Sequence, residues 1–316
     1  MRGIPQALVI LAGLFFGPGE RSSPGLSTPD FQLQKVGNGV WAAIVNDQGL
    51  AGGNAGFVIG GDGVLIIDTF QDPRPAKALL AEIRKLTPLP IRFVVNTHYH
   101  LDHVNGNDVF AAASATIVAH RNVRAWMRSE NIKMLDPPVT PEKKARVESL
   151  TLPTVVYDSH IELYLGARRI DVRYYPGHTG GDSVVSIPDA RVVFCGDMLW
   201  KEHVPNLIDA TTKAWVESLD AMQKDYGTST WVPGHGAVAT AQDVLTFRKY
   251  LADLRAGVRR EQAAGKSGDA LVQALLPGLK SNYGTWGFFN DYAALDIEQT
   301  AQELSGTKRL PPNPER

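Results

Sequence analysis

Short apolar runs separated by turn residues dominate the chain from Phe31 onward. Residues 31–36 and 40–45 flank a Gly-Asn-Gly turn, and residues 56–59 and 64–67 flank a Gly-Gly-Asp-Gly turn. Apolar runs of this length on either side of a glycine-rich turn are typical of β-hairpins. The first part of the chain is therefore predicted to form two hairpins.

Helical periodicity alternates with further strand-like runs. In 73–86, apolar residues fall at i, i+3, i+4, i+7 and i+10 counted from Ala76, which predicts an amphipathic helix. Thr240 followed by Asp243 is a capping-box pattern, which predicts a long helix ending near residue 262. We expect further strands at 91–95, 116–119, 161–165, 169–175, 183–187, 192–195 and 230–232, and helices at 105–112, 121–128, 141–150, 213–225, 269–275 and 291–304. This alternation predicts an α/β fold in which two packed sheets carry outer layers of helices.

Composition narrows the class of protein. The 316 residues are 44% apolar and 21% charged, as in an ordinary globular protein, and suit one large unit or two domains of about 150 residues. The net charge of −1 provides no basic surface for nucleic acid, so a small-molecule substrate is expected. The only cysteine is Cys195, which excludes a disulfide framework, a thiolate zinc finger and an iron–sulfur cluster held by this chain alone.

The N-terminus resembles a secretory signal. One arginine precedes the uncharged apolar run 7–16, and a segment rich in Ser, Pro and Gly follows it. A bilayer span needs about 20 apolar residues, so this run is too short to be a membrane anchor. We expect residues 1–27 to be a signal peptide with a flexible segment, and the mature protein to be periplasmic or secreted, with no membrane attachment.

Four potential metal ligands crowd into six residues after the apolar run 91–95. They are His98, His100, Asp102 and His103. Three imidazoles this close would repel one another if charged, and they are better explained as neutral ligands of a divalent cation. In an extended segment His98 and His100 point to the same side, while Asp102 and His103 can turn toward a neighbouring position. One loop can therefore serve two metals.

Three further residues occur in a similar local setting. His178, Asp197 and His235 each follow an expected strand and stand next to glycine in a tight turn. Glycine lets the backbone bend sharply there, and functional side chains collect on loops at sheet edges. Each residue alone would be an ordinary turn residue, but together with the first cluster they indicate a metal centre.

These residues resemble the metallo-β-lactamase superfamily. Residues 97–103 read T-H-x-H-x-D-H, and Pro-Gly-His-Thr, Gly-Asp and Pro-Gly-His-Gly segments follow in that family's order. The upstream segment 65–69, Leu-Ile-Ile-Asp-Thr, also matches. The resemblance covers residues 33–251 approximately, and it implies an αββα four-layer sandwich to which we expect a C-terminal helical extension to be added.

The resemblance also implies a ligand set and a reaction. His98, His100 and His178 would hold the first metal, Asp102, His103 and His235 the second, and Asp197 would bridge them, with Asp68 nearby but not a ligand. The implied cofactor is two Zn²⁺, with iron or manganese as alternatives. The implied enzyme is a hydrolase that cleaves a C(=O)–X bond of an ester, thioester, lactone or β-lactam with a metal-bridged hydroxide, which Asp102 would orient as the catalytic residue.

The chain combines features of two groups within that superfamily. Asp102-His103 and Asp197 resemble glyoxalase II, arylsulfatase-like and lactonase members, because lactamases with a thiolate ligand would have Gly-Cys where this chain has Gly196-Asp197. In contrast, Lys201 and the run 206–209 resemble the lysine and asparagine that those lactamases use on their substrate. Lys201, Asn206 and His203 are therefore candidate substrate-binding residues, and weak β-lactamase activity is compatible with the pattern. Cys195 is interpreted as a small buried apolar residue.

Several alternatives remain open from the sequence. A di-iron oxidoreductase on the same fold would use similar ligands, and a phosphodiesterase or nuclease would use the same metals. We expect residues 28–251 to form the sandwich and 252–316 a helical extension packed on it, in a monomer or weak dimer. The aromatic segment 282–292 is interpreted as a docking segment, with a wall of the substrate pocket as the alternative.

Overall fold

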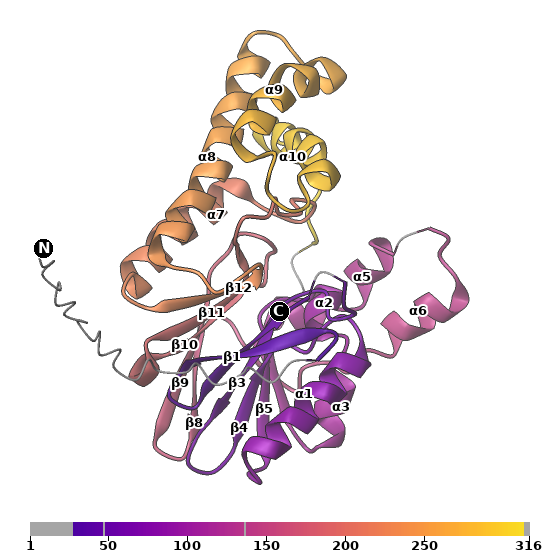
Figure 1. The fold of residues 1–316 in the computed structure, drawn as a ribbon. Helices are drawn as coiled ribbons and strands as arrows, with labels where there is room; N and C mark the ends of the chain where they lie inside the picture. The colour runs from indigo at the N-terminus through magenta and orange to yellow at the C-terminus, as the bar shows by residue number, and fades with distance from the viewer. Residues whose placement is uncertain (1–27, 47, 136, 313–316) are drawn as a thin grey trace, which may run out of the picture.

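Two β-sheets pack face to face, and helices cover both outer faces (Figure 1). The computed structural model describes residues 28–46, 48–135 and 137–312. The expected signal peptide at residues 1–27 lies outside these residues.

The first sheet contains the N-terminal strands in chain order. Its members are β1 (Phe31–Gly37), β2 (Val40–Val45), β3 (Ala55–Ile59), β4 (Val64–Ile67), β5 (Ile91–Asn96), β6 (Thr116–His120) and β7 (Val155–Tyr157). Both predicted hairpins are confirmed, because β1 pairs antiparallel with β2 and β3 pairs antiparallel with β4. From β4 to β7 the strands run parallel. The carboxyl ends of these parallel strands therefore meet at one edge of the sheet.

The second sheet is built from the later half of the chain. In spatial order it contains β12 (Thr230–His235), β11 (Val192–Trp200), β10 (Ser183–Ile187), β9 (Arg168–Tyr174) and β8 (His160–Leu165). The strands β8 to β11 pair antiparallel, and β11 pairs parallel with β12. The ends of β11 and β12 consequently lie side by side.

Helices occur mainly where the periodicity predicts them. They are α1 (Pro73–Leu86), α2 (Leu101–Val104), α3 (Asn107–Ala112), α4 (Arg121–Trp126), α5 (Ser129–Lys133), α6 (Pro141–Glu148), α7 (Thr212–Tyr226), α8 (Ala241–Ala263), α9 (Gly268–Tyr283) and α10 (Phe289–Leu304), with a 3₁₀ turn at Pro188–Ala190. The α1 bounds agree with the prediction, and α8 begins with the predicted capping box of Thr240 and Asp243. The short α2, α5 and β7 were not predicted.

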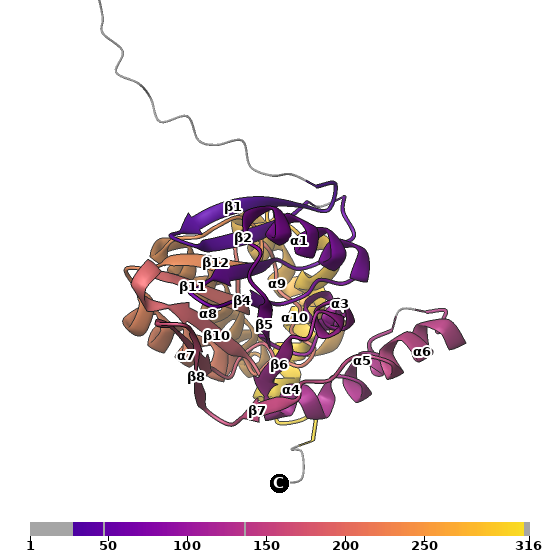
Figure 2. The same cartoon turned by 90° about the horizontal axis from the view of Figure 1, so that it is seen from below.

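Apolar side chains fill three layers of core. Residues such as Val95 in the first sheet and Val185 in the second pack between the two sheets. Ala76 and Leu79 of α1 cover the outer face of the first sheet, and Trp215 of α7 and Phe247 of α8 cover the outer face of the second. Figure 2 shows α1 and α3 on one side of the sheets and α7 and α8 on the other. The order of layers is therefore αββα, as expected.

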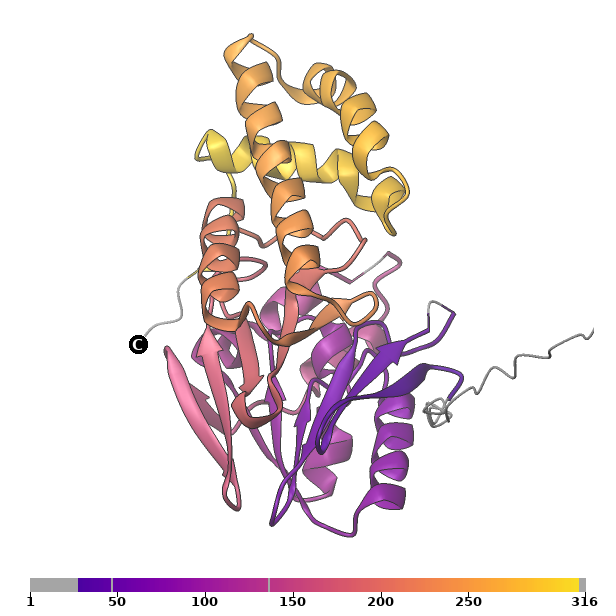
Figure 3. The same ribbon diagram turned by 60° about the vertical axis from the view of Figure 1, so that its left-hand side comes forward.

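The C-terminal helices form a bundle that is continuous with the sandwich. Helix α8 lies along the second sheet and continues beyond it, where α9 and α10 pack against it (Figure 3). Tyr250 of α8 donates a 2.7 Å hydrogen bond to the buried Asp296 of α10. The expected boundary between residues 251 and 252 lies within α8, and the division into domains stays a prediction.

The end of the described chain returns to the sandwich. After α10, the Lys308 ammonium group donates hydrogen bonds of 2.5 and 2.7 Å to the carbonyl oxygens of Leu207 and Ala210 in the β11–α7 loop. Burial lowers the pKa of Lys308 to about 8.

Across the part of the chain that the structure describes, we find no helix with the length and apolar character needed to cross a membrane.

Candidate metal centre

The first group of predicted ligands lies at the carboxyl end of β5. His98 and His100 follow the strand in the loop, and Asp102 and His103 lie in the one-turn helix α2. The three histidines are buried. Asp102 retains 22% side-chain exposure, so it is the member of this group that can face a substrate.

The second group comes from three places in the other sheet. His178 lies in the loop between β9 and β10, Asp197 lies in β11, and His235 is the last residue of β12. The Asp182 carboxylate accepts hydrogen bonds from the backbone N–H groups of Gly177 and Thr179, at 3.1 and 2.7 Å. These bonds fix the turn that carries His178.

The structure corrects the expected end of β11. The strand was expected to end at Cys195, with Asp197 beyond it, but it continues to Trp200. Gly196 adopts φ = +50°, and the pairing with β12 shifts register on both sides of it. This irregularity turns Asp197 toward the site while Cys195 packs in the apolar core on the outer face of the sheet. Burial raises the pKa of the Cys195 thiol, so this side chain is a buried apolar group, as interpreted.

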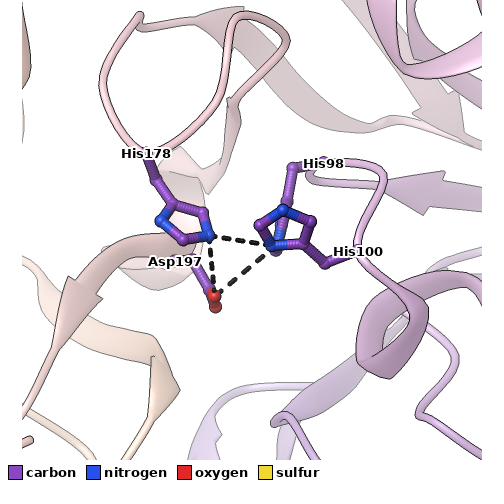
Figure 4. Close-up of side chains that lie close together, drawn as sticks. All are labelled: His98, His100, His178 and Asp197. Atoms are coloured by element: carbon purple, nitrogen blue, oxygen red, sulfur yellow. Dashed lines mark hydrogen bonds and ion pairs between the residues drawn. The ribbon is translucent and has the colours of Figure 1, made fainter. Parts of the chain in front are cut away.

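Four side chains converge to form a first ligand set. His98, His100, His178 and Asp197 point toward one another (Figure 4). His178 Nε2 lies 3.0 Å from His100 Nδ1 and 3.3 Å from Asp197 Oδ2. His98 Nε2 lies 3.6 Å from the same carboxylate oxygen.

A second ligand set shares Asp197 with the first. It contains Asp102, His103, Asp197 and His235. His103 Nε2 lies 3.1 Å from Asp197 Oδ1, and His235 Nε2 lies 3.3 Å from Asp102 Oδ2 and 3.5 Å from Asp197 Oδ2. The seven predicted residues therefore form two adjacent sets that meet at one carboxylate.

These sets fit divalent cations in geometry and in donor chemistry. Two ligands about 2.1 Å from a tetrahedral ion are about 3.4 Å apart, and the separations above range from 3.0 to 3.6 Å. Buried ring nitrogens of His98, His103 and His235 and one oxygen of Asp197 have no hydrogen-bond partner among the described residues. Because unpartnered buried polar atoms are costly, these atoms are best explained as ligands of bound ions.

The electrostatics lead to the same conclusion. Burial opposes protonation of His103 and His235, but the neighbouring carboxylates of Asp197 and Asp102 outweigh this effect. They raise the pKa of His103 well above its ordinary value and the pKa of His235 to about 9. Burial lowers the pKa of His178 to about 3. Despite burial, the nearby histidines hold the pKa values of Asp102 and Asp197 well below the usual range. The carboxylates thus require positive charge, which protons or metal ions can supply.

Asp68 orients one of these histidines without belonging to either ligand set. Its Oδ2 atom lies 2.8 Å from His103 Nδ1, and the carboxylate also accepts hydrogen bonds of 2.7 Å from the backbone and the hydroxyl of Thr97. This contact leaves His103 Nε2 to face the second ligand set. A carboxylate in this position fixes the tautomer and the orientation of the ring.

Asp209 has the corresponding position beside His100 and was not predicted. Its Oδ2 atom lies 3.5 Å from His100 Nε2 and accepts a 2.5 Å hydrogen bond from the Tyr99 hydroxyl. His100 uses its other nitrogen, Nδ1, in the first ligand set. The sequence offers no spacing signal for this contact, because Asp209 is more than a hundred residues away.

A cavity of about 870 Å³ opens onto the two ligand sets. Its lining includes His100, Asp102, Asp197 and His235 together with Asn206. Asn206 therefore reaches the cavity, as the candidate substrate-binding role requires.

The other two candidate substrate-binding residues are not among those that line this cavity. Lys201 turns away, because its ammonium group donates a 3.1 Å hydrogen bond to the Val238 carbonyl and lies 3.5 Å from Asp243. The His203 ring contacts Phe288, with centroids 5.2 Å apart, and its Nδ1 atom lies 2.7 Å from the Lys201 carbonyl oxygen. The direction of the chain after β11 aims these two side chains at the β12–α8 connection and at the segment before α10.

The fold and the paired ligand sets together define a metallo-hydrolase scaffold. A family model described as the metallo-beta-lactamase superfamily matches residues 49–247. The chain belongs to this superfamily.

Relatives of the chain are named for different activities. The chain is 24% identical over 275 residues to the linear primary-alkylsulfatase of a Pseudomonas species, covering 71% of this chain and 52% of the relative. It is 27% identical over 181 residues to the hydroxyacylglutathione hydrolase of Brucella anthropi, covering 55% of this chain and 60% of the relative. A type 2 metallo-beta-lactamase of Pseudomonas aeruginosa is 24% identical over 221 residues, covering 67% of this chain and 80% of the relative. The matches thus span about half to three fifths of the length of the first two relatives.

Solved structures share the fold. A metallo-beta-lactamase from Pontibacter korlensis superposes with a TM-score of 0.60 at 21% identity, covering 71% of this chain and 99% of that chain. The metallo-beta-lactamase TMB-1 gives a TM-score of 0.57 at 21% identity, covering 72% and 99%. Both comparisons identify the sandwich and cover less than three quarters of this chain.

Proposed function

We propose that this protein is a dinuclear zinc hydrolase that cleaves a C(=O)–X bond. The observation that carries the proposal is the pair of four-residue ligand sets that share Asp197 at the floor of an open cavity. Two divalent cations at these positions would polarise a carbonyl oxygen and lower the pKa of a water molecule between them. Family membership is consistent with this chemistry.

The donor atoms support zinc as the cation. Each ligand set combines imidazole nitrogens with carboxylate oxygens and contains no thiolate. Such mixed sets suit zinc, and iron and manganese also accept them. Metal analysis of the purified protein decides among them, and iron with a visible absorption band would instead support the oxidoreductase alternative.

Asp102 is the chain's own catalytic group in this proposal. It lines the cavity, and its carboxylate is ionised at neutral pH because nearby histidines hold its pKa well below the usual range. An ionised carboxylate there can accept a hydrogen bond from the attacking water and orient it toward the substrate. Cys195, which is buried in the core, is not placed to act as a nucleophile.

A sulfate ester is the second candidate substrate. The match to the linear primary-alkylsulfatase spans 71% of this chain, a larger share than the hydroxyacylglutathione hydrolase match spans. The same ligand sets could polarise a sulfate oxygen. The two candidates differ in the bond that is cleaved, so a substrate panel separates them.

The test is a panel of chromogenic esters, thioesters, lactones, β-lactams, sulfate esters and phosphodiesters, assayed with and without a chelator. We expect zinc-dependent turnover of at least one carbonyl substrate. Turnover of sulfate esters alone would favour the second candidate, and turnover of phosphodiesters alone would support the nuclease alternative.

Replacement of Asp102 tests its role. We expect Asp102→Ala to lower kcat by about 10²–10⁴-fold, the usual contribution of a positioned acid or base, with an unchanged circular dichroism spectrum. Asp269→Ala, at an exposed position on α9, is the matched control and should retain parent activity. Turnover of Asp102→Ala at the parent rate would refute the role.

A further inference from the structure

Phe288 adopts a backbone conformation that is unfavourable for an aromatic residue. It has φ = +59° and ψ = 9°, in the left-handed region, at the residue before α10. Bulky L residues rarely adopt this conformation. The conformation does not bury the ring, because Phe288 remains 40% exposed. Local strain that leaves an apolar ring exposed beside a cavity suggests a functional position.

The neighbouring residues hold Phe288 in place. The Gly287 N–H donates a 2.9 Å hydrogen bond to the Glu202 carbonyl, and the Val204 N–H donates a 2.8 Å bond to the Gly287 carbonyl. A Cβ atom on Gly287 would lie 2.3 Å from the His203 ring, so only glycine fits there. The segment before α10 is therefore fastened to the chain that follows β11.

Phe288, Tyr292 and Trp200 form an aromatic wall beside the ligand sets. All three line the cavity. The Phe288 ring centroid lies 6.0 Å from that of Trp200 and 5.8 Å from that of Tyr292. Trp200 stacks on the ligand residue His235, with centroids 3.9 Å apart and 26° between the ring planes. The aromatic wall thus begins at the proposed metals and extends outward.

Other apolar side chains complete the lining. They are Leu101, Met134, Leu135, Val147 and Ile208. Ile208 is 42% exposed, like Phe288. The charged side chains of the lining other than the proposed ligands are Glu142, Lys143 and Arg146, all from α6. Arg146 is already bonded to Asn105.

We infer that the aromatic wall binds an extended apolar acyl group, so that the substrates are esters of medium-chain acids rather than of short or highly charged ones. This inference rests on the proposed function and adds a substrate class to it. Large apolar surface exposed next to a reactive centre is typical of a ligand-binding site. Ordering such a group against the wall would hold the scissile carbonyl near the ligand sets, because His235 is stacked against Trp200.

The experiment uses the zinc-reconstituted full chain and glycerol monoesters with acetyl, butyryl, hexanoyl and octanoyl groups. The leaving group is polar and constant, so only the acyl chain varies, and released acid is titrated. We expect kcat/KM to rise with chain length. Phe288→Ala should lower kcat/KM for the octanoyl ester by about tenfold, the loss expected when a few methylene contacts are removed, and for the acetyl ester by less than about twofold.

Two further variants control for folding. Phe288→Leu keeps an apolar side chain and should retain most of the chain-length preference. Leu295→Ala removes a 51%-exposed apolar side chain from α10, the helix that follows Phe288. This side chain is not among those that line the cavity, so the variant should leave the profile unchanged.

A binding measurement separates this inference from the proposed function. Because Trp200 lies in the wall, octanoate should change the tryptophan fluorescence of the metal-free protein, acetate should not, and Phe288→Ala should weaken the octanoate effect. Octanoate binding without turnover of any ester, thioester, lactone or β-lactam would refute the proposed hydrolase and keep the apolar site. Ester turnover with a flat chain-length profile, or with equal losses for all esters in Phe288→Ala, would overturn the inference and keep the hydrolase.

Discussion

At the scale of single residues, the contact between Asp209 and His100 leads to a first prediction. The carboxylate lies 3.5 Å from His100 Nε2 and can hold the ring so that Nδ1 faces the first ligand set. Loss of such a supporting carboxylate typically lowers metal affinity about 10–100-fold. We therefore expect Asp209→Ala to lower the affinity for one of the two proposed zinc ions by this factor. Competition with a chromophoric chelator measures this affinity.

Tyr99→Phe is the control for this measurement. It removes the hydroxyl bonded to Asp209 but keeps the carboxylate beside His100. A small change in Tyr99→Phe and a large one in Asp209→Ala would assign the effect to the carboxylate. If Asp209→Ala bound both zinc ions with the same affinities as the parent protein, His100 would need no such support.

Short-range patterns account for what could be predicted about individual residues. His98, His100, Asp102 and His103 are adjacent in the sequence, and their convergence with His178, Asp197 and His235 is confirmed. Their role as metal ligands stays a prediction. Asp209 was missed and Lys201 was misplaced because both depend on the path of the chain after β11, which local spacing does not determine.

At the scale of elements, a buried carboxyl group between α8 and α10 predicts a pH dependence of stability. Burial raises the pKa of Asp296 well above its ordinary value, although Tyr250 donates a hydrogen bond to it. A carboxyl group with a raised folded-state pKa contributes its stability below the unfolded pKa of about 4 and loses it as the pH rises toward the folded value. Ionisation of Asp296 should therefore lower the free energy of unfolding of the metal-free protein as the pH rises above about 4.

Asp296→Asn isolates this contribution. An amide oxygen can still accept the Tyr250 hydrogen bond, and the amide does not ionise. We expect the difference in Tm between Asp296→Asn and the parent protein to shift in favour of the variant as the pH is raised, measured by thermal unfolding in the presence of chelator. A difference that stays constant from pH 5 to pH 8 would refute the assignment.

Elements defined by local sequence were predicted well, and those defined by tertiary pairing were not. The hairpins and α1 follow from turn chemistry and periodicity, so their bounds were nearly correct. In contrast, β11 and β12 continue past glycine and proline because each pairs with the other through an irregular register. The three-residue β7 exists because β6 offers it an edge, and no local pattern specifies it.

At the scale of the whole molecule, both ligand sets draw side chains from both sheets. The loop after β5 supplies His98 and the adjoining helix α2 supplies His103, whereas β11 and β12 supply Asp197 and His235. A cation in either set therefore connects the two halves of the sandwich. Since a ligand that binds only the folded state at 100 times its Kd adds about 2.7 kcal/mol, we expect metal removal to lower Tm by several degrees.

Calorimetry with metal analysis checks this expectation. Chelation should lower Tm, and added zinc should restore it with two ions bound per chain. An unchanged Tm in protein shown to be metal-free would mean that the two halves of the sandwich are held together without the ions.

The layered architecture followed from alternating strands and helices, together with the family resemblance. The placement of the C-terminal helices did not follow from the sequence. Of the aromatic segment 282–292, Tyr283 and Phe289 are buried in the bundle, whereas Phe288 and Tyr292 line the cavity. Helical spacing in this region predicts helices but not which residues face the site.

The return of Lys308 to the β11–α7 loop has a consequence for how the protein matures. During synthesis every proposed ligand emerges well before this lysine. The ligand sets can therefore assemble while the loop that carries Asp209 still lacks the two hydrogen bonds from Lys308. The two bonds that Lys308 donates to this loop can therefore form only after residue 308 has left the ribosome.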